Sequence, residues 1–220
     1  MFWRLLPHAT ICVASDRLIL LDSRQDRYLM VPQKISGPVL AWLSAEPMTP
    51  APKVLIDLLT AGGTLRAADA RPGNAERFEI TVPRTLAGGM CDASAADARH
   101  LPQIACIVIG TRLGLRFRGF DSTLRRLGAS AIYGQCEPVA AALARIAAYE
   151  RARRYVPLAR NCLLDSLAQV RWLAKGGIGG RLVFGVTGEP FAAHCWLQSD
   201  KAILNDTYEH VSRFTPIMVL

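Results

Sequence analysis

Apolar and polar residues form three short patterned stretches near the N-terminus of the 220-residue chain. They read ATICVA (9–14), RLILLD (17–22) and RYLMVP (27–32), and short polar segments separate them. Apolar runs of this length, bounded by turn residues, are typical of a β-meander. The chain is therefore expected to begin with three strands joined by tight turns.

Beyond the third stretch, the apolar residues recur every three or four positions, as in helices. This period predicts a helix over about 33–45 and a second one in TPAPKVLIDLLTAGG, with Thr49 as N-cap and Gly62 as its end. A third helix near 65–72 is only weakly marked. Residues 1–82 are thus predicted to form a small domain of three strands followed by helices.

The second half of the chain is predicted to be a separate domain. Residues 83–102 are rich in Gly, Ala, Pro and Asp without a sustained period, and they are interpreted as a linker. Helical periods follow in residues 103–117, in FDSTLRRLGAS and in PVAAALARIAAYERARR. A further helix and several strands complete residues 103–220, so the predicted fold class is α+β.

One cysteine lies where a helix is expected to begin. In ARNCLLD, Asn161 is a favourable N-cap, which puts Cys162 at the first helical position and off the apolar stripe of the helix. The positive end of the helix dipole and its free N–H groups favour a thiolate there. The six cysteines show no CxxC pair and no regular spacing, so neither a metal site nor a disulfide framework is expected.

A histidine and an aspartate follow on two segments that are predicted to be neighbouring strands. FAAHCWLQ alternates so that His194 and Trp196 share one face, while Cys195 points to the opposite, inward face. If KAILND pairs with it in a hairpin whose facing residue numbers sum to 400, His194 lies opposite Asp206. Asp206 could then orient the imidazole toward Cys162, as in an activated-nucleophile triad. Trp196 either lines the substrate cleft or packs in the core.

Composition narrows the class of protein. The chain is 51% hydrophobic and has a net charge of +8, but its arginine-rich segments carry no zinc-finger, RNP or bZIP pattern. No nucleic-acid partner is therefore expected. Because no apolar run reaches the roughly 18 residues of a membrane span and the start lacks a signal-peptide pattern, a cytoplasmic protein without membrane contact is expected.

The C-terminal motifs resemble a known family. Helix-borne Cys162, the HxW at His194 and the ND that ends at Asp206 follow one another as in the transglutaminase-like cysteine peptidases. More closely, NCLLDSLAQVRWL and GRLVFGVTGEPFAAHCWLQSD resemble the lasso-peptide B proteins over about 105–220, although Cys195 stands where that family commonly has Ala. The resemblance implies a papain- or transglutaminase-like domain in which Cys162, His194 and Asp206 are catalytic.

The same resemblance gives the first half an expected role. In those B proteins that consist of one polypeptide, the N-terminal domain is similar to the small winged-helix-like PqqD domain, which has three strands and three helices. It implies that the leader of a precursor peptide adds a strand beside the third strand, where the candidate contacts are Arg27, Tyr28, Leu29, Met30 and Val31. The alternative is an ordinary edge strand protected by charge.

The implied function is cleavage of the leader from the core of a ribosomally made lasso-peptide precursor. A partner cyclase similar to asparagine synthetase then closes the macrolactam. No cofactor is expected on this chain, which has no recognisable nucleotide motif, and the ATP dependence of the family is expected to act through the cyclase. Two alternatives stay open: a non-catalytic chaperone that binds the precursor, and an acyl transferase of the transglutaminase type.

Overall fold

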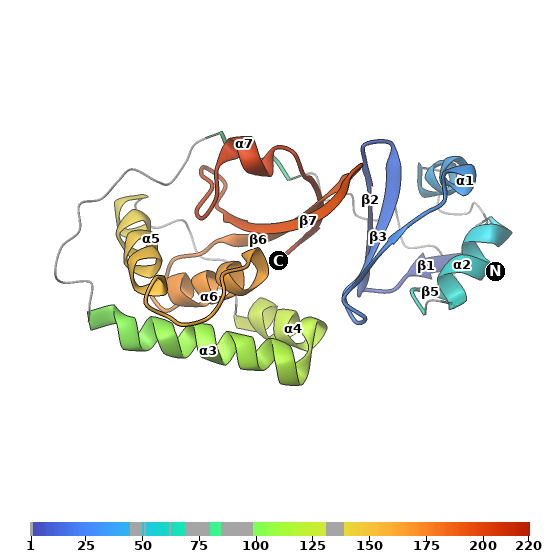
Figure 1. The fold of residues 1–220 in the computed structure, drawn as a ribbon. Helices are drawn as coiled ribbons and strands as arrows, with labels where there is room; N and C mark the ends of the chain where they lie inside the picture. Colours follow the sequence, from blue (N-terminus) through green and yellow to red (C-terminus); the bar gives the residue numbers. More distant parts are fainter. Residues whose placement is uncertain are drawn as a thin grey trace.

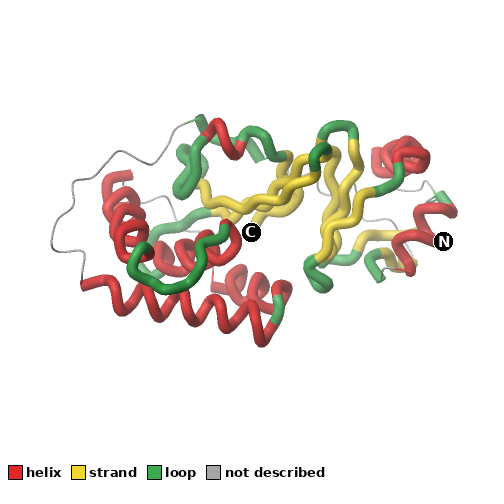
Figure 2. Tube along the Cα trace, in the orientation of Figure 1, coloured by secondary structure: helices red, strands yellow, loops and turns green. Residues whose placement is uncertain are grey.

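The computed structural model describes residues 2–44, 50, 52–61, 63–68, 80–84, 99–130 and 139–220. These residues form three small antiparallel sheets and the helices around them (Figures 1 and 2). Residues 85–98 of the predicted linker lie outside the described residues, as do Thr49 and Gly62, the predicted limits of the second helix.

The predicted N-terminal meander is present. It consists of β2 (Ala9–Ala14), β3 (Arg17–Asp22) and β4 (Arg27–Met30), with β3 in the centre of the sheet. Asp16 and Asp26 adopt positive φ angles in the two turns, a conformation that Asp tolerates better than most residues. The central strand is buried over nearly its whole length, whereas β4 is an edge of the sheet.

Two helices cover one face of this sheet, α1 (Gln33–Ser44) and α2 (Lys53–Ala61). The sheet and the helices share a core cluster made of Leu18, Leu20, Val31, Val39, Trp42, Leu55 and Leu59. The predicted third helix near 65–72 is wrong, because β5 (Leu65–Ala68) pairs with β1 (Phe2–Leu5). A partner strand satisfies the backbone of so short a segment better than a single helical turn does. In the described part of this half, two helices stand where the resemblance implies three.

The C-terminal half combines helices with a second three-stranded sheet. Its helices are α3 (Leu101–Arg118), α4 (Phe120–Ser130), α5 (Val139–Arg153), α6 (Cys162–Ala174) and α7 (Tyr208–Val211). Its central strand is β6 (Arg181–Gly188), flanked by β7 (Phe191–Gln198) and β8 (Thr215–Val219). Helices α3 to α6 lie on one side of this sheet and α7 on the other (Figure 1).

The two halves pack against each other through their sheets. Ala14, Ile19 and Leu21, on the face that α1 and α2 leave free, belong to the same core cluster as Phe184 of β6 and Ile217 of β8. Both halves therefore share a continuous hydrophobic core. Among the described residues, no helix is both long and apolar enough to span a membrane.

Candidate active site

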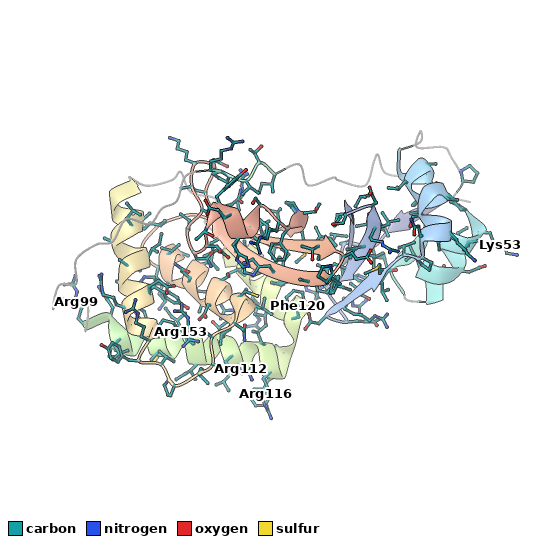
Figure 3. The ribbon with its side chains drawn as sticks, turned by 45° about the horizontal axis from the view of Figure 1, so that its top comes forward. Lys53, Arg99, Arg112, Arg116, Phe120 and Arg153 are labelled. Carbon is teal, nitrogen blue, oxygen red and sulfur yellow. The ribbon has the colours of Figure 1, made fainter. Side chains whose placement is uncertain are left out.

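Cys162 is the first residue of α6, as predicted. Asn161 is extended, and its Oδ1 accepts a 2.7 Å hydrogen bond from the N–H of Leu164. Arg153 of α5 (Figure 3) holds the start of α6 and the loop before it. Its buried side chain donates from Nε to Asp165 Oδ1 at 2.5 Å and from Nη2 to the Ala159 carbonyl at 3.3 Å. This anchor fixes the N-terminus of α6, and with it the cysteine, relative to α5.

His194 on β7 links the cysteine to Asp206. Its Nε2 lies 2.5 Å from Asp206 Oδ2, and both side chains are mostly buried. The imidazole also interacts with the Cys162 thiol, and both side chains line the same pocket. Because Nε2 is occupied by the carboxylate, Nδ1 is the nitrogen left for the sulfur. The structure thus brings together the three residues that the sequence predicted as a triad.

The predicted hairpin register is wrong by one residue. KAILND makes an isolated bridge between Gln198 and Ile203 instead of a strand. The Leu204 N–H donates to the Leu197 carbonyl, so facing residues sum to 401 and not to 400. The ladder ends there, and the contact with the histidine is made by a loop.

Hydrogen bonds of the Asn205 side chain, instead of a β-ladder, hold the loop that carries Asp206. Asn205 Oδ1 accepts a 2.7 Å hydrogen bond from the N–H of Leu197 on β7, and its Nδ2 donates to Ser166 Oγ at 2.8 Å. Ser166 lies on α6, one turn beyond the cysteine. One side chain therefore ties the loop to a strand and a helix, and this places Asp206 beside His194.

The electrostatics of the site favour an ion pair. The hydrogen bond to His194 lowers the pKa of the Cys162 thiol, helped by the backbone N–H groups of Cys195 and Leu163 and opposed by burial. Burial alone would lower the pKa of His194, but hydrogen bonds to Asp206 and Cys162 outweigh it and raise that pKa to about 9. The arrangement therefore favours a thiolate beside an imidazolium.

A second histidine, which the sequence reasoning missed, also contacts Asp206. His210 Nδ1 lies 3.0 Å from both carboxylate oxygens, and its ring centroid is 4.5 Å from that of His194. Burial would raise the pKa of Asp206, but hydrogen bonds from His194, the Thr207 N–H and His210 lower it. His194, Asp206 and His210 are also close enough to hold a metal ion together, with ligand atoms within 4.8 Å of one another. The four-residue spacing of Asp206 and His210 would have revealed the contact if α7 had been predicted.

A pocket of about 260 Å³ lies beside the triad. Residues of α5, α6 and β7 and the loops that carry Arg160 and Asn205 line it. Its charged side chains are paired within the protein: Arg160 contacts Glu150 at 2.7 Å and Asp165 at 3.3 Å. The pocket gives a substrate a place to lie next to the cysteine.

The two residues after His194 are part of the core. Cys195 is buried on the inward face, as predicted, and burial raises the pKa of its thiol. Trp196 is fully buried, lies with its ring centroid 6.1 Å from that of His194, and donates from Nε1 to Gln198 Oε1. Of the two roles left open for Trp196, core packing is the one observed, and its side chain does not line the pocket.

The candidate leader contacts separate into exposed and buried side chains. Arg27 and Met30 are exposed on β4. Leu29 packs against the N-terminal core, and Val31 is 2% exposed, which excludes a leader contact through its side chain. Val31 also donates its N–H to the Leu18 carbonyl.

Tyr28 connects this edge strand with the catalytic half. Its ring centroid is 5.5 Å from that of Phe191, the first residue of β7. Burial, together with the nearby Cys195 and Cys162, raises the pKa of its phenol. The edge strand therefore contacts β7, the strand that carries His194.

Comparison with known families matches residues 105–219 to the transglutaminase-like superfamily. The match spans just over half of the protein, and the chain therefore belongs to this superfamily. Such a domain is consistent with a peptidase or an acyltransferase. No curated protein and no solved structure matched the chain.

Proposed function

We propose that the chain is a cysteine peptidase that binds the leader of a lasso-peptide precursor and cuts it from the core. The observation that carries the proposal is the set of Cys162, His194 and Asp206 around one open pocket, with His194 hydrogen-bonded to Asp206, in a protein of the transglutaminase-like superfamily. A nucleophile, its base and an orienting carboxylate are the parts that acyl transfer requires.

In the proposed reaction, the Cys162 thiolate attacks the scissile carbonyl while His194 holds the proton. His194 donates that proton to the leaving amine, and the leader remains as a thioester on the cysteine. The imidazole next takes a proton from water, the hydroxide attacks the thioester, and the leader carboxylate leaves as the thiol is restored. Asp206 keeps the imidazole oriented throughout, and N–H groups at the start of α6 serve the oxyanion.

The N-terminal half supplies leader binding in this proposal. The N–H of Val31 pairs with β3, so the alternation of an antiparallel ladder points the backbone groups of Tyr28 and Met30 toward the open edge. A leader strand could pair there, with Arg27 near its acidic side chains. The contact of Tyr28 with Phe191 supports a path from this edge to the pocket.

The rest of the proposal concerns partners and place. The freed core passes to a separate cyclase that uses ATP, in the cytoplasm. Since the sequence has no recognisable nucleotide motif, we propose that ATP acts through the cyclase. Nucleotide binding by the purified protein alone would contradict this part.

Family membership also supports a second candidate, an acyl transferase. The same thioester could be attacked by an amine instead of water, because the triad chemistry is common to both reactions. Product masses distinguish the two outcomes: hydrolysis adds water to the leader, whereas transfer adds the amine and excludes the water.

The test is a product assay with full-length precursor, the cyclase and ATP. Cys162→Ala should abolish leader release and keep leader affinity. Cys106→Ala, at an exposed cysteine of α3, is the matched control and should release leader normally. Undiminished release by Cys162→Ala would overturn the cysteine mechanism, and normal leader binding without cleavage by the parent protein would favour a chaperone.

A further inference from the structure

Gln169 on α6 is a buried polar residue without a partner. Its side chain is 0% exposed, and neither its carboxamide oxygen nor its nitrogen has a hydrogen-bond partner in the described structure. Buried carboxamides are nearly always paired, because leaving such a group unsatisfied opposes folding. Gln169 also lines the pocket beside the triad. An unpaired amide at a pocket wall is a group that a ligand can satisfy.

The helix sets the distance between this amide and the nucleophile. Cys162, Ser166 and Gln169 follow one another at i, i+4 and i+7, so they lie on one face of α6. At a rise of about 1.5 Å per residue, Gln169 is about 10 Å along the axis from the cysteine. An extended peptide advances about 3.3 Å per residue, so a side chain within two residues of the scissile carbonyl would reach it.

The charged side chains of the pocket outside the triad are already paired. Arg160 is paired with Glu150, Asp165 is paired with both Arg160 and Arg153, and Asn205 holds the loop of the triad. Among the described residues of the pocket, a charged substrate group would therefore find its counter-charges engaged. A carboxamide, which both donates and accepts, suits an uncharged partner.

We propose that Gln169 is a specificity-determining residue that binds a hydroxyl or carboxamide side chain of the peptide substrate, close to the scissile bond. This inference rests on the proposed function, since it requires a peptide in the pocket. It adds the substrate class: a peptide with an uncharged hydrogen-bonding side chain within two residues of the bond that is cut.

The test uses peptide vinyl sulfones that alkylate the Cys162 thiolate of the full-length protein. The first pair of probes is Ac-Ala-Ala-Thr and Ac-Ala-Ala-Val, and the second is Ac-Ala-Thr-Ala and Ac-Ala-Val-Ala. Two further pairs have Asn in one member and Leu in the other at the same two positions. Each pair differs by a polar group at nearly constant shape. Mass spectrometry gives the rate of adduct formation for each probe.

The parent protein should prefer the polar member of at least one pair by about tenfold or more. Gln169→Met, which keeps the length and removes both polar atoms, should lose that preference. It should melt no lower than the parent, because it removes an unpaired buried group. Gln33→Met makes the same chemical change at an exposed residue of α1 and should keep the preference.

If the ratio of the polar-probe rate to the apolar-probe rate were equal in the parent and in Gln169→Met, the inference would be overturned. The same result is expected if water alone satisfies the amide. The ratio is independent of how strongly the thiol is activated, since weak activation slows both members of a pair alike. The absolute rate with iodoacetamide reports on that activation separately. A slow iodoacetamide reaction with an intact ratio would count against the peptidase and not against the subsite.

Discussion

His194 and Asp206 are in hydrogen-bonding contact, with Nε2 and Oδ2 2.5 Å apart, although no β-ladder places them opposite each other. The loop that carries Asp206 leaves the hairpin, and Asn205 fixes it to β7 and α6 instead. The orientation of the imidazole therefore depends on side-chain hydrogen bonds and not on strand pairing. Substitution of the residues that hold this loop should therefore change the chemistry of the site.

Asp206→Asn should reduce leader release by about 10²- to 10⁴-fold, because the imidazole loses the carboxylate that orients and charges it. The hydrogen bond that His194 donates to Asp206 helps to raise the pKa of His194, so the variant should lose activity at a lower alkaline pH than the parent. Release rates across pH measure both effects. Asp200→Asn, in the exposed turn where the side chain pairs with Arg181, is the control and should behave as the parent does.

Asn205→Ala should weaken both the fold and the site. It leaves the Leu197 N–H without its acceptor, which should cost about 1–3 kcal/mol in the free energy of unfolding. Because Asp206 is then held less firmly, alkylation of Cys162 at neutral pH should also slow. Asn205→Asp keeps that acceptor and should recover part of the loss in both. A fall in stability with an unchanged alkylation rate would show that Asn205 does not position the triad.

Met30→Pro should weaken leader binding without unfolding the protein. The Met30 N–H points to the open edge of β4, and proline is tolerated on edge strands because it removes only an outward donor. Leader affinity measured by titration should fall about tenfold, the equivalent of one or two hydrogen bonds. Val13→Pro, on the opposite edge strand β2, is the matched control. Equal losses of affinity in both variants would argue against binding at β4.

Gly188→Ala should disturb the contact between the two halves. A Cβ at Gly188 would overlap the carbonyl oxygen of Ala14, which lies in the sheet of the other half. The strain should lower the free energy of unfolding by about 1–3 kcal/mol. Gly110→Ala is the control: nothing lies within 4 Å of its Cβ, and in the middle of α3 alanine should stabilise by about 0.5–1 kcal/mol. Thermal denaturation measures both. Destabilisation of equal size in the two variants would contradict the proposed sheet-to-sheet packing.

Local chemistry explains the features that could be predicted from the sequence. The cap at Asn161 uses a hydrogen bond to Leu164, three residues away, and the faces of β7 follow from strict alternation. Both features depend on neighbouring residues alone. They were enough to assign Cys162 to a helix start and His194 to the triad face.

The features that were missed depend on contacts between distant segments. Asn205 and Ser166 are 39 residues apart, and β1 finds its partner β5 about 60 residues along the chain. Periodicity contains no information about such pairings. The triad was found despite the wrong register because Asp206 lies only two residues past Leu204, the last residue whose own backbone is bonded to the backbone of β7, where the loop could still turn toward His194.

The central claim, a Cys162 thiolate held by His194, is tested most directly by the pH dependence of Cys162 alkylation. Iodoacetamide reacts with the thiolate, and peptide mapping follows Cys162 alone. The hydrogen bond to His194 lowers the pKa of Cys162, so the rate in the parent should rise through a midpoint below the ordinary cysteine value of about 8.5. In His194→Ala, that midpoint should move up. Identical midpoints in the two proteins, at the ordinary value, would contradict the account.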